Sequence, residues 1–363
     1  MPDVIGTLDF IWEQMLREIG NLTIQPLNRH RFCVAPMLDW TDRHERYFLR
    51  LLSRQAMLYT EMITSGALVH GDAPRHLRFS HAEHPVAIQL GGSDPLDLAR
   101  CAELAAAAGY DEINLNIGCP SDRVQSGRFG ACLMADPALV ATCVRAMQDS
   151  VSPPITIKCR TGIDADDNDQ YLQNFIACVA EAGCETFIIH ARIAILKGLS
   201  PKENRDIPPL NYPRVFGIKE RYPHLQIVLN GGLKTLEECR DVLDHVDGVM
   251  LGREVYHNPW ILANVDAEFF GQRPCTRSRH DVLREFLPYV QEQLELGIPL
   301  QHMTRHILGL FHGVSGGKAF RRYLSENAFR RDAGISVLED AMNCVEERSW
   351  EVESVDAREA DLA

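Results

Sequence analysis

Eight short segments rich in β-branched and other apolar residues recur between residues 32 and 251, and stretches with helical spacing separate most of them. Continuous apolar runs such as Val86–Ile88 and Phe187–Ile189 indicate strands that are covered on both faces, as in a parallel sheet. Eight strand-then-helix units predict a (β/α)8 TIM barrel, with a doubly wound sheet as the alternative. The expected strands are Phe32–Met37, Met57–Met62, Val86–Leu90, Glu112–Ile117, Ile155–Cys159, Thr186–His190, Ile227–Asn230 and Gly248–Leu251.

The rest of the chain predicts a second, smaller unit. From about Tyr256 the pattern is helical only, which indicates a small all-α helical domain after the barrel. The helices expected in the barrel include Pro95–Ala108, Pro137–Gln148 and Thr235–His245, and those expected beyond it are Asp281–Leu294, Leu300–Leu310 and Ala319–Phe329. The expected division is an N-terminal extension with one amphipathic helix (1–30), the TIM barrel (31–265), the helical domain (266–335) and an acidic C-terminal tail (336–363).

Composition limits the partners and the compartment. The net charge of −13 by itself argues against a nucleic-acid partner. Basic residues nevertheless cluster in residues 318–331, and this cluster is either a local binding patch or a solvated helix face. No apolar run is long enough to span a bilayer, and residues 1–30 lack a secretion signal. The eleven cysteines contain no C-x-x-C pair, which favours a reducing cytoplasm over a disulfide framework or a zinc site, and we expect no metal.

Nearly every expected strand ends in a side chain capable of chemistry, at the end where barrel enzymes build their active sites. The most informative case is Asn116–Pro120, which places the Cys119 thiol in a turn directly after a strand. Such a cysteine is a nucleophile, a metal ligand or a proton donor, unless it is an inert buried thiol. Lys158 and His190 end the fifth and sixth strands, and together with Gln89 they would ring the mouth with donors for a planar, carbonyl-rich ring such as a flavin.

Glycine-rich turns after the last two strands predict a phosphate site. Asn230–Gly232 follows the seventh strand and Gly252–Arg253 follows the eighth. Backbone N–H groups in these turns of a barrel often bind phosphate, and an arginine adds a charged donor. No G-x-G-x-x-G motif opens a helix, so a Rossmann dinucleotide domain is not expected.

These residues resemble the tRNA-dihydrouridine synthase family, and in particular its bacterial A subfamily, from about Phe32 to Arg330. The resemblance implies an FMN-binding barrel followed by a helical tRNA-binding domain. It also implies NADPH-dependent reduction of the C5=C6 bond of D-loop uridines, expected to be U20 and U20a, in a tRNA that a monomer binds. The segments that carry the resemblance are Ala35–Asp42, Tyr59–Met62, Gln89–Ser93, Asn114–Val124, Ile189–Arg192, Leu199–Arg205, Asn230–Gly232 and Gly252–Arg253.

The same resemblance implies roles for individual residues. Cys119 would be the general acid that protonates C5, and Asn116 would touch the target uridine. A free cysteine thiol ionises near pH 8.5 and is mainly protonated at neutral pH, which suits an acid. The implied cofactor contacts are Pro36, Met37, Leu38, Gln89, Lys158 and His190 for the flavin ring or ribityl chain, and Asn230, Gly231, Gly232, Gly252 and Arg253 for its phosphate. The implied tRNA contacts are Lys202, Arg205, Lys318, Arg321 and Arg322.

Two other functions stay open on the sequence. An FMN barrel that reduces a free pyrimidine would share the phosphate turns and the cysteine acid, but it would not need a basic helical domain. A tRNA-binding folding factor, in which catalysis is incidental, would need the basic surface but not the set of Lys158, His190 and Cys119.

Overall fold

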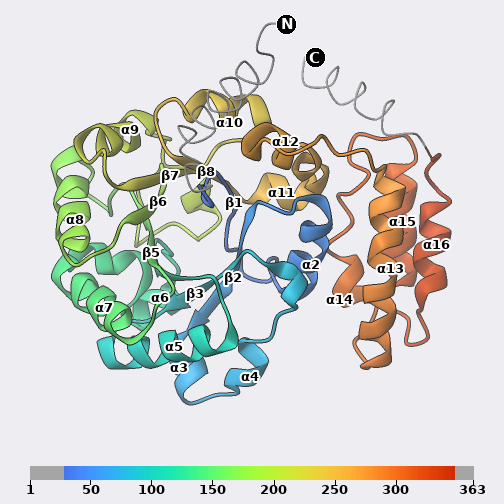
Figure 1. Ribbon diagram of the computed structural model, residues 1–363, viewed down its shortest axis with the longest axis horizontal. Coiled ribbons are helices and arrows are strands. Elements are labelled where there is room, and N and C mark those ends of the chain that lie inside the picture. Colours follow the sequence, from blue (N-terminus) through green and yellow to red (C-terminus); the bar gives the residue numbers. More distant parts are fainter. Residues whose placement is uncertain (1–27, 348–363) are drawn as a thin grey trace, which may run out of the picture.

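The computed structural model describes residues 28–347. Its eight strands form one closed parallel barrel in sequence order, which confirms the TIM barrel expected from the sequence and excludes the doubly wound sheet (Figure 1). The amphipathic helix expected in residues 1–30 lies almost wholly outside the described residues. The strands are β1 (Phe32–Val34), β2 (Met57–Thr64), β3 (Val86–Gly91), β4 (Glu112–Ile117), β5 (Ile155–Arg160), β6 (Thr186–His190), β7 (Gln226–Asn230) and β8 (Gly248–Leu251).

The first strand is shorter than the sequence indicates. It was expected to reach Met37, but β1 ends at Val34, and the backbone N–H of Ala35 makes one more bond to the carbonyl of Leu251 at 2.7 Å. Pro36 follows and has no N–H to donate, so the hydrogen-bonded ladder cannot continue through it.

Side chains point alternately outward and inward along each strand, and this produces two separate apolar cores. Outward side chains pack against the surrounding helices in one large core. Inward side chains form a smaller core inside the barrel, made of Cys33, Ala35, Met57, Tyr59, Ala87, Ile188, Val228 and Met250.

The amino-terminal end of the barrel is closed by a buried ionic network centred on Glu112. The Glu112 carboxylate accepts hydrogen bonds from Tyr59 Oη at 2.7 Å and from Thr156 Oγ1 at 2.6 Å, and it contacts His30 Nε2 at 2.5 Å. Burial disfavours the carboxylate, but charged His30 and the hydrogen bonds outweigh it and lower the pKa of Glu112. The charged Glu112 can be buried in this barrel because both of its carboxylate oxygens have hydrogen-bond partners.

Helices surround the barrel, and further helices lie to one side of it (Figure 1). Their starts follow sequence signals: Asp94 caps α5, and Thr235 with Glu238 forms a capping box at α10. The helices of the barrel region are α2 (Arg43–Leu52), α3 (Ser65–Val69), α4 (Ala73–His76), α5 (Pro95–Ala108), α6 (Asp122–Ser126), α7 (Pro137–Ser150), α8 (Asp169–Glu181), α9 (Tyr212–Arg221), α10 (Leu236–Val242), α11 (Arg253–His257) and α12 (Val265–Phe270).

The helical domain follows as α13 (Arg279–Glu295), α14 (Gln301–Thr304), α15 (Gly317–Asn327) and α16 (Ile335–Met342). Two expected boundaries shift. Phe269 of α12 packs its ring against Phe32 of β1 at 5.3 Å, so the barrel region extends past residue 265. Leu338 and Ala341 of α16 are fully buried, so the helical part continues past residue 336, where the acidic tail was expected to begin.

One expected helix is wrong. Residues 300–310 have helical spacing, but α14 ends at Thr304, and turns whose hydrogen bonds join residues three positions apart follow it. Tertiary contacts explain the change. Gly309 lies so close to the backbone of His257 that a Cβ there would come within 2.4 Å of the His257 carbonyl oxygen. His306 turns toward the barrel helix α2, and these contacts outweigh the local helical preference.

The helical domain is docked on α2 by aromatic and charged contacts. Tyr289 stacks on Tyr47 with ring centroids 3.8 Å apart and donates or accepts a hydrogen bond with His44 Nδ1 at 2.8 Å. The fully buried His306 imidazole lies between two carboxylates of the barrel, 3.1 Å from Asp42 and 3.2 Å from Glu45. Burial would lower the pKa of His306, but hydrogen bonds and charge attraction from Asp42 and Glu45 raise it to about 9.

We expect the folded protein to lose stability as the pH rises from 7 through about 9. Because the folded pKa of His306 lies above its unfolded value of 6.5, its contribution is complete below pH 6.5 and is lost through about 9. The full effect is up to about 3 kcal/mol. Burial also raises the pKa of Glu45 to about 7. The titration of Glu45 therefore changes stability mainly below pH 7, and the measurement is confined to pH 7–10 to separate it from that of His306.

The check is denaturant unfolding of the wild type and of His306→Gln across that pH range. The variant should be less stable at pH 7 and should show a flatter profile, whereas His312→Gln, at an exposed histidine of the same segment, should follow the wild type. Parallel profiles for the wild type and His306→Gln would contradict the assignment.

Candidate active site at the barrel mouth

The carboxyl ends of the strands bring most of the sequence-predicted site residues to one mouth. Cys119 lies two residues after β4, is partly exposed, and its Sγ is 3.5 Å from Ser121 Oγ. Lys158 is on β5, His190 ends β6 and Asn230 ends β7, so the topology groups side chains that are more than 100 residues apart in sequence.

The side chain of Asn116 shapes the turn that carries Cys119. Its Oδ1 accepts hydrogen bonds from the backbone N–H groups of Gly118 at 3.0 Å and Cys119 at 2.9 Å. The Cys119 carbonyl in turn accepts the N–H of Ala131 at 2.9 Å. Gly130 has a φ of 74°, and a Cβ there would lie 2.6 Å from that carbonyl, so glycine is needed beside this turn.

A line of hydrogen bonds inside the barrel supports Asn116 from below. Asn116 Nδ2 donates to Gln89 Oε1, Gln89 Nε2 donates to Asn114 Oδ1, and Asn114 Nδ2 donates to Thr156 Oγ1, each at 2.8 Å. Thr156 then donates to Glu112 at the barrel base. The line makes Asn116 a positioning residue for Cys119, in addition to the uridine contact that the resemblance implies. Gln89 is 1 % exposed, and its amide is occupied by the two asparagines.

Lys158 and His190 lie in a positively charged part of the mouth. Lys158 Nζ donates to Asn230 Oδ1 at 2.9 Å, and burial together with Arg160 lowers the pKa of Lys158 to about 7. Burial and the neighbouring cations also lower the pKa of His190 well below its usual value. The Nδ1 atom of His190 is buried without a hydrogen-bond partner among the described residues, so the mouth offers an unused polar atom to a ligand.

The two glycine turns form a narrow cradle beside these side chains. Gly231 and Gly232 have φ values of 108° and 87°. A Cβ on Gly231 would come within 2.9 Å of the His190 ring, and one on Gly232 within 2.7 Å of Tyr212 Oη, so only glycine leaves this space open. Gly252 faces Ala35 and Met37 at the neighbouring strand end. The cradle and the unused imidazole atom fit a planar cofactor that carries a phosphate.

Arg160 is a site residue that the sequence reasoning did not assign. It is 5 % exposed, and its guanidinium donates to the carbonyls of Gly118 at 3.2 Å, Ile193 at 3.1 Å and Asn204 at 2.9 Å. It thereby ties the Cys119 turn to the loop after β6. The alternation of side chains along a strand could have predicted this role, because Arg160 lies two residues after Lys158 and therefore faces the same way.

The loop of residues 199–205 also reaches the mouth. Asn204 is fully buried and anchors the loop through hydrogen bonds to the backbone of Ile195 at 2.7 and 2.9 Å. Lys202 and Arg205 are exposed on this loop, and Arg205 feels the charges of Arg253 and Cys119. Arg253, expected at the phosphate, forms an ion pair with Asp206 at 2.8 Å.

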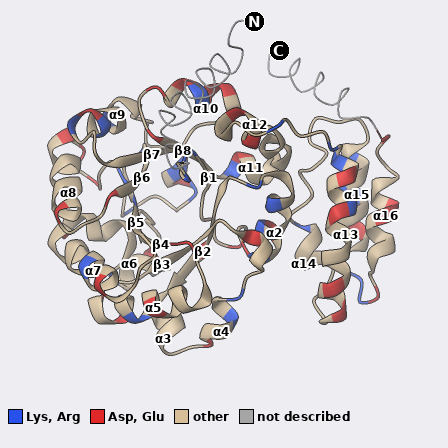
Figure 2. Ribbon diagram, viewed as in Figure 1, with Lys and Arg blue, Asp and Glu red and all other residues tan. Residues whose placement is uncertain are grey.

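The remaining predicted residues divide between the rim and the helical domain. Pro36 and Met37 are partly buried beside the mouth, and Leu38 is 66 % exposed. Lys318, Arg321 and Arg322 lie on α15, apart from the barrel mouth, so the fold does not bring them to the Cys119 turn (Figure 2). Residues 28–347 contain no cluster of three metal-ligating side chains, and no helix among them is long and apolar enough to cross a membrane.

Comparison with known proteins relates most of this chain to one family of enzymes. The family model described as dihydrouridine synthase matches residues 33–346. A protein of Salmonella typhimurium named tRNA-dihydrouridine(20/20a) synthase is 58% identical over 323 residues, 89% of this chain and 97% of that protein. Proteins with the same name are 59% identical in Escherichia coli K12 (88% of this chain, 92% of that protein) and 58% identical in Vibrio cholerae (86% and 95%). The chain therefore belongs to the dihydrouridine synthase family of flavin-dependent oxidoreductases.

Proposed function

We propose that this protein is a tRNA-dihydrouridine synthase that reduces the C5=C6 bond of uridines 20 and 20a, with FMN as cofactor and NADPH as reductant. The observation that carries the proposal is the Cys119 thiol, fixed by Asn116 at the barrel mouth beside Lys158 and the glycine cradle. The 58% and 59% identities to proteins with that named activity support the same substrate and positions. We expect a cytoplasmic enzyme that acts on tRNA as a monomer.

The residues at the mouth fit the proposed cofactor. Lys158 and His190, with Pro36–Leu38 at the rim, would hold the isoalloxazine ring and ribityl chain. Gln89 would join them only by sharing the amide that now bonds to Asn114 and Asn116. The turns at Asn230–Gly232 and Gly252–Arg253 would hold the phosphate, for which Arg253 would have to leave or share Asp206. The chemistry that a bound FMN supplies is hydride transfer from NADPH to C6 of the uracil ring.

The chain itself supplies the proton. Cys119 Sγ–H donates its proton to C5 of the uracil as the hydride reaches C6, so the S–H bond and the π bond of C5=C6 break, two C–H bonds form, and a C5–C6 single bond remains. Lys158 and Arg160 lie near enough to interact with the charge of the thiolate left on Cys119, and this thiolate recovers a proton from solvent. The target base has to leave its stacked position in the tRNA to reach this thiol, at a cost of a few kcal/mol.

The experiment that tests the proposal has two parts. The purified protein should show flavin absorption, and with NADPH it should convert uridines of a tRNA transcript to products two hydrogens heavier, located by mass mapping to positions 20 and 20a. Activity on free uracil or orotate, with none on tRNA, would favour the enzyme that reduces a free pyrimidine. Binding of tRNA without any reduction would favour the folding factor.

Replacing Cys119 with alanine separates the two halves of the reaction. Cys119→Ala should retain flavin and oxidise NADPH normally, and dihydrouridine formation should fall at least about a hundredfold, because the proton donor is lost. Cys132→Ala is the matched control, since Cys132 is another partly buried thiol in the next segment and its Sγ bonds only to the Phe129 carbonyl. Normal turnover by Cys119→Ala would refute the acid role.

Changes at Asn116 should affect the reaction through the position of Cys119. Asn116→Ala removes the acceptor for two backbone N–H groups, and turnover should fall about tenfold or more while flavin content is unchanged. Asn116→Ser keeps a neutral side-chain oxygen that can accept nearby backbone N–H groups and loses the bond to Gln89, so it should retain more activity than the alanine variant. Equal losses in the two variants would contradict the positioning role.

The basic residues of α15 are tested by charge reversal. The double variant Arg321→Glu with Arg322→Glu should weaken tRNA binding and reduce its dependence on salt, because phosphate contacts release counterions. NADPH oxidation should not change. Arg145→Glu, an exposed arginine on α7, serves as the control. A tRNA affinity equal to that of the control would remove α15 from the interface.

A further inference from the structure

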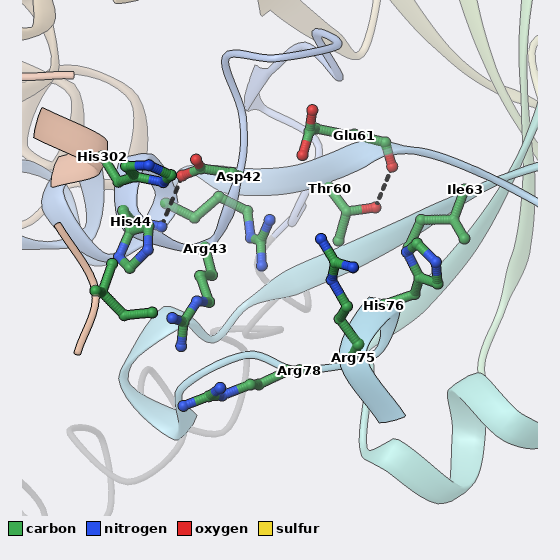
Figure 3. A pocket seen from close by; sticks show the side chains of 12 residues that line it. Asp42, Arg43, His44, Thr60, Glu61, Ile63, Arg75, His76, Arg78 and His302 are labelled. Carbon is green, nitrogen blue, oxygen red and sulfur yellow. Dashed lines mark hydrogen bonds between the residues drawn. The ribbon is translucent and has the colours of Figure 1, made fainter. Parts of the chain in front are cut away.

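A second hollow, separate from the Cys119 turn, lies between the barrel and the helical domain (Figure 3). Its volume is about 610 Å³. The barrel contributes the start of α2, the second half of β2 and the α4 region, and the helical domain closes one side with Ile298, which follows α13, and His302 of α14. The lining residues are Asp42, Arg43, His44, Arg46, Thr60, Glu61, Ile63, Arg75, His76, Arg78, Ile298 and His302.

Three guanidinium groups in this pocket have no counterion. Arg43, Arg75 and Arg78 make no ion pair within 4.0 Å with any carboxylate of residues 28–347, whereas the fourth arginine, Arg46, is paired with Glu83 at 2.7 Å. Arg75 and Arg78 are exposed and Arg43 is partly buried. Burial lowers the pKa of Arg43, and the charge of Arg78 lowers it further, which shows that these two cations lie close enough to repel each other.

Two carboxylates, Asp42 and Glu61, line this pocket with the four arginines, and the charge of Asp42 attracts Arg43. Asp42 is engaged with His306 at 3.1 Å and with Arg305 at 2.6 Å, both from the helical domain. Glu61 accepts the backbone N–H of Asp39 at 2.5 Å, and burial raises its pKa. The excess positive charge of the pocket is therefore free for an anionic ligand.

The arginines, and not His44, supply that charge beside α2. Burial lowers the pKa of His44 to about 4, so this imidazole is neutral at neutral pH, and its Nδ1 is bonded to Tyr289 at 2.8 Å. A guanidinium stays charged and presents several N–H donors in one plane, a geometry that suits phosphate oxygens.

The position of the pocket relates it to the barrel mouth. Glu61 precedes Met62, which pairs in register with Gln89, the residue that bonds to Asn116 below the Cys119 turn. An extended polyanion with one nucleotide at the mouth can therefore pass over β2 and reach the helical domain through this pocket. A chain of phosphates suits a site built from both domains better than the single terminal phosphate of a small nucleotide does.

We propose that Arg43, Arg75 and Arg78 bind backbone phosphates of the RNA substrate beside the reacting nucleotide. The proposal rests on the proposed function and adds a second contact surface, separate from α15 and from the loop of residues 199–205. Its role is to hold the RNA on the barrel side while the target base enters the mouth, with the contacts giving affinity and orientation and no base specificity.

The test is the double variant Arg75→Ala with Arg78→Ala, in the full chain. Both residues are exposed, so the variant should fold, and its melting temperature and flavin content should equal those of the wild type. Its affinity for a tRNA transcript should fall about tenfold, and the slope of log affinity against log salt should decrease by about one to two. NADPH oxidation without tRNA should not change. The control is Arg145→Ala, an exposed arginine on the distant helix α7.

The contrary outcomes differ from one another. A double variant that binds tRNA as tightly as Arg145→Ala, in a protein whose wild type modifies tRNA, would overturn the phosphate pocket and leave the proposed function intact. An increased KM for NADPH but not for NADH, with tRNA affinity unchanged, would assign the arginines to the nucleotide's extra phosphate and also overturn it. A wild type that neither binds nor modifies tRNA would overturn both proposals.

Discussion

The side-chain amide of Asn116 is the contact on which the rest of the site depends. One oxygen holds two backbone N–H groups of the Cys119 turn, and the amide nitrogen ties that turn to Gln89 and, through Asn114 and Thr156, to the barrel base. A thiol on a free loop would sample many positions, whereas the turn that carries this one is tied to β3, β4 and β5. The position of the proton donor therefore depends on the packing of neighbouring strands as well as on its own turn.

The two ends of the barrel show how the fold separates stability from chemistry. At the base, Glu112 is buried, and every nearby group neutralises or bonds it. At the mouth, His190 keeps an unused nitrogen, Lys158 is held by a single amide oxygen, and glycines leave open space. Groups that are fully satisfied stabilise the fold, while groups left unsatisfied are available to a ligand.

The contact between the two domains also leaves some charges paired and others unpaired. His306 lies between Asp42 and Glu45, and Arg305 forms a further ion pair with Asp42, so the two carboxylates at the start of α2 are engaged by the helical domain. The neighbouring Arg43 forms no ion pair with a carboxylate of residues 28–347, and it faces the hollow between the domains. The docking of the helical domain thus leaves a positive surface on a protein whose net charge is −13, and overall charge alone says little about where an anion binds.

The strands, the barrel and the mouth residues were accessible from sequence because period-2 and period-3.6 patterns and strand-end motifs are local, and a closed parallel sheet then brings all strand ends together. Sequence could not reveal that Leu300–Leu310 breaks into turns, since the cause is the approach of His257 and α2 from elsewhere in the chain. Nor could it show that Arg253 pairs with Asp206, that Arg160 joins two loops, or that Arg43 and Arg78 face one hollow. Local pattern determined the elements and the chemistry that each one carries. Packing alone decided which charges are cancelled and which are left free, because that depends on distances between residues far apart in sequence.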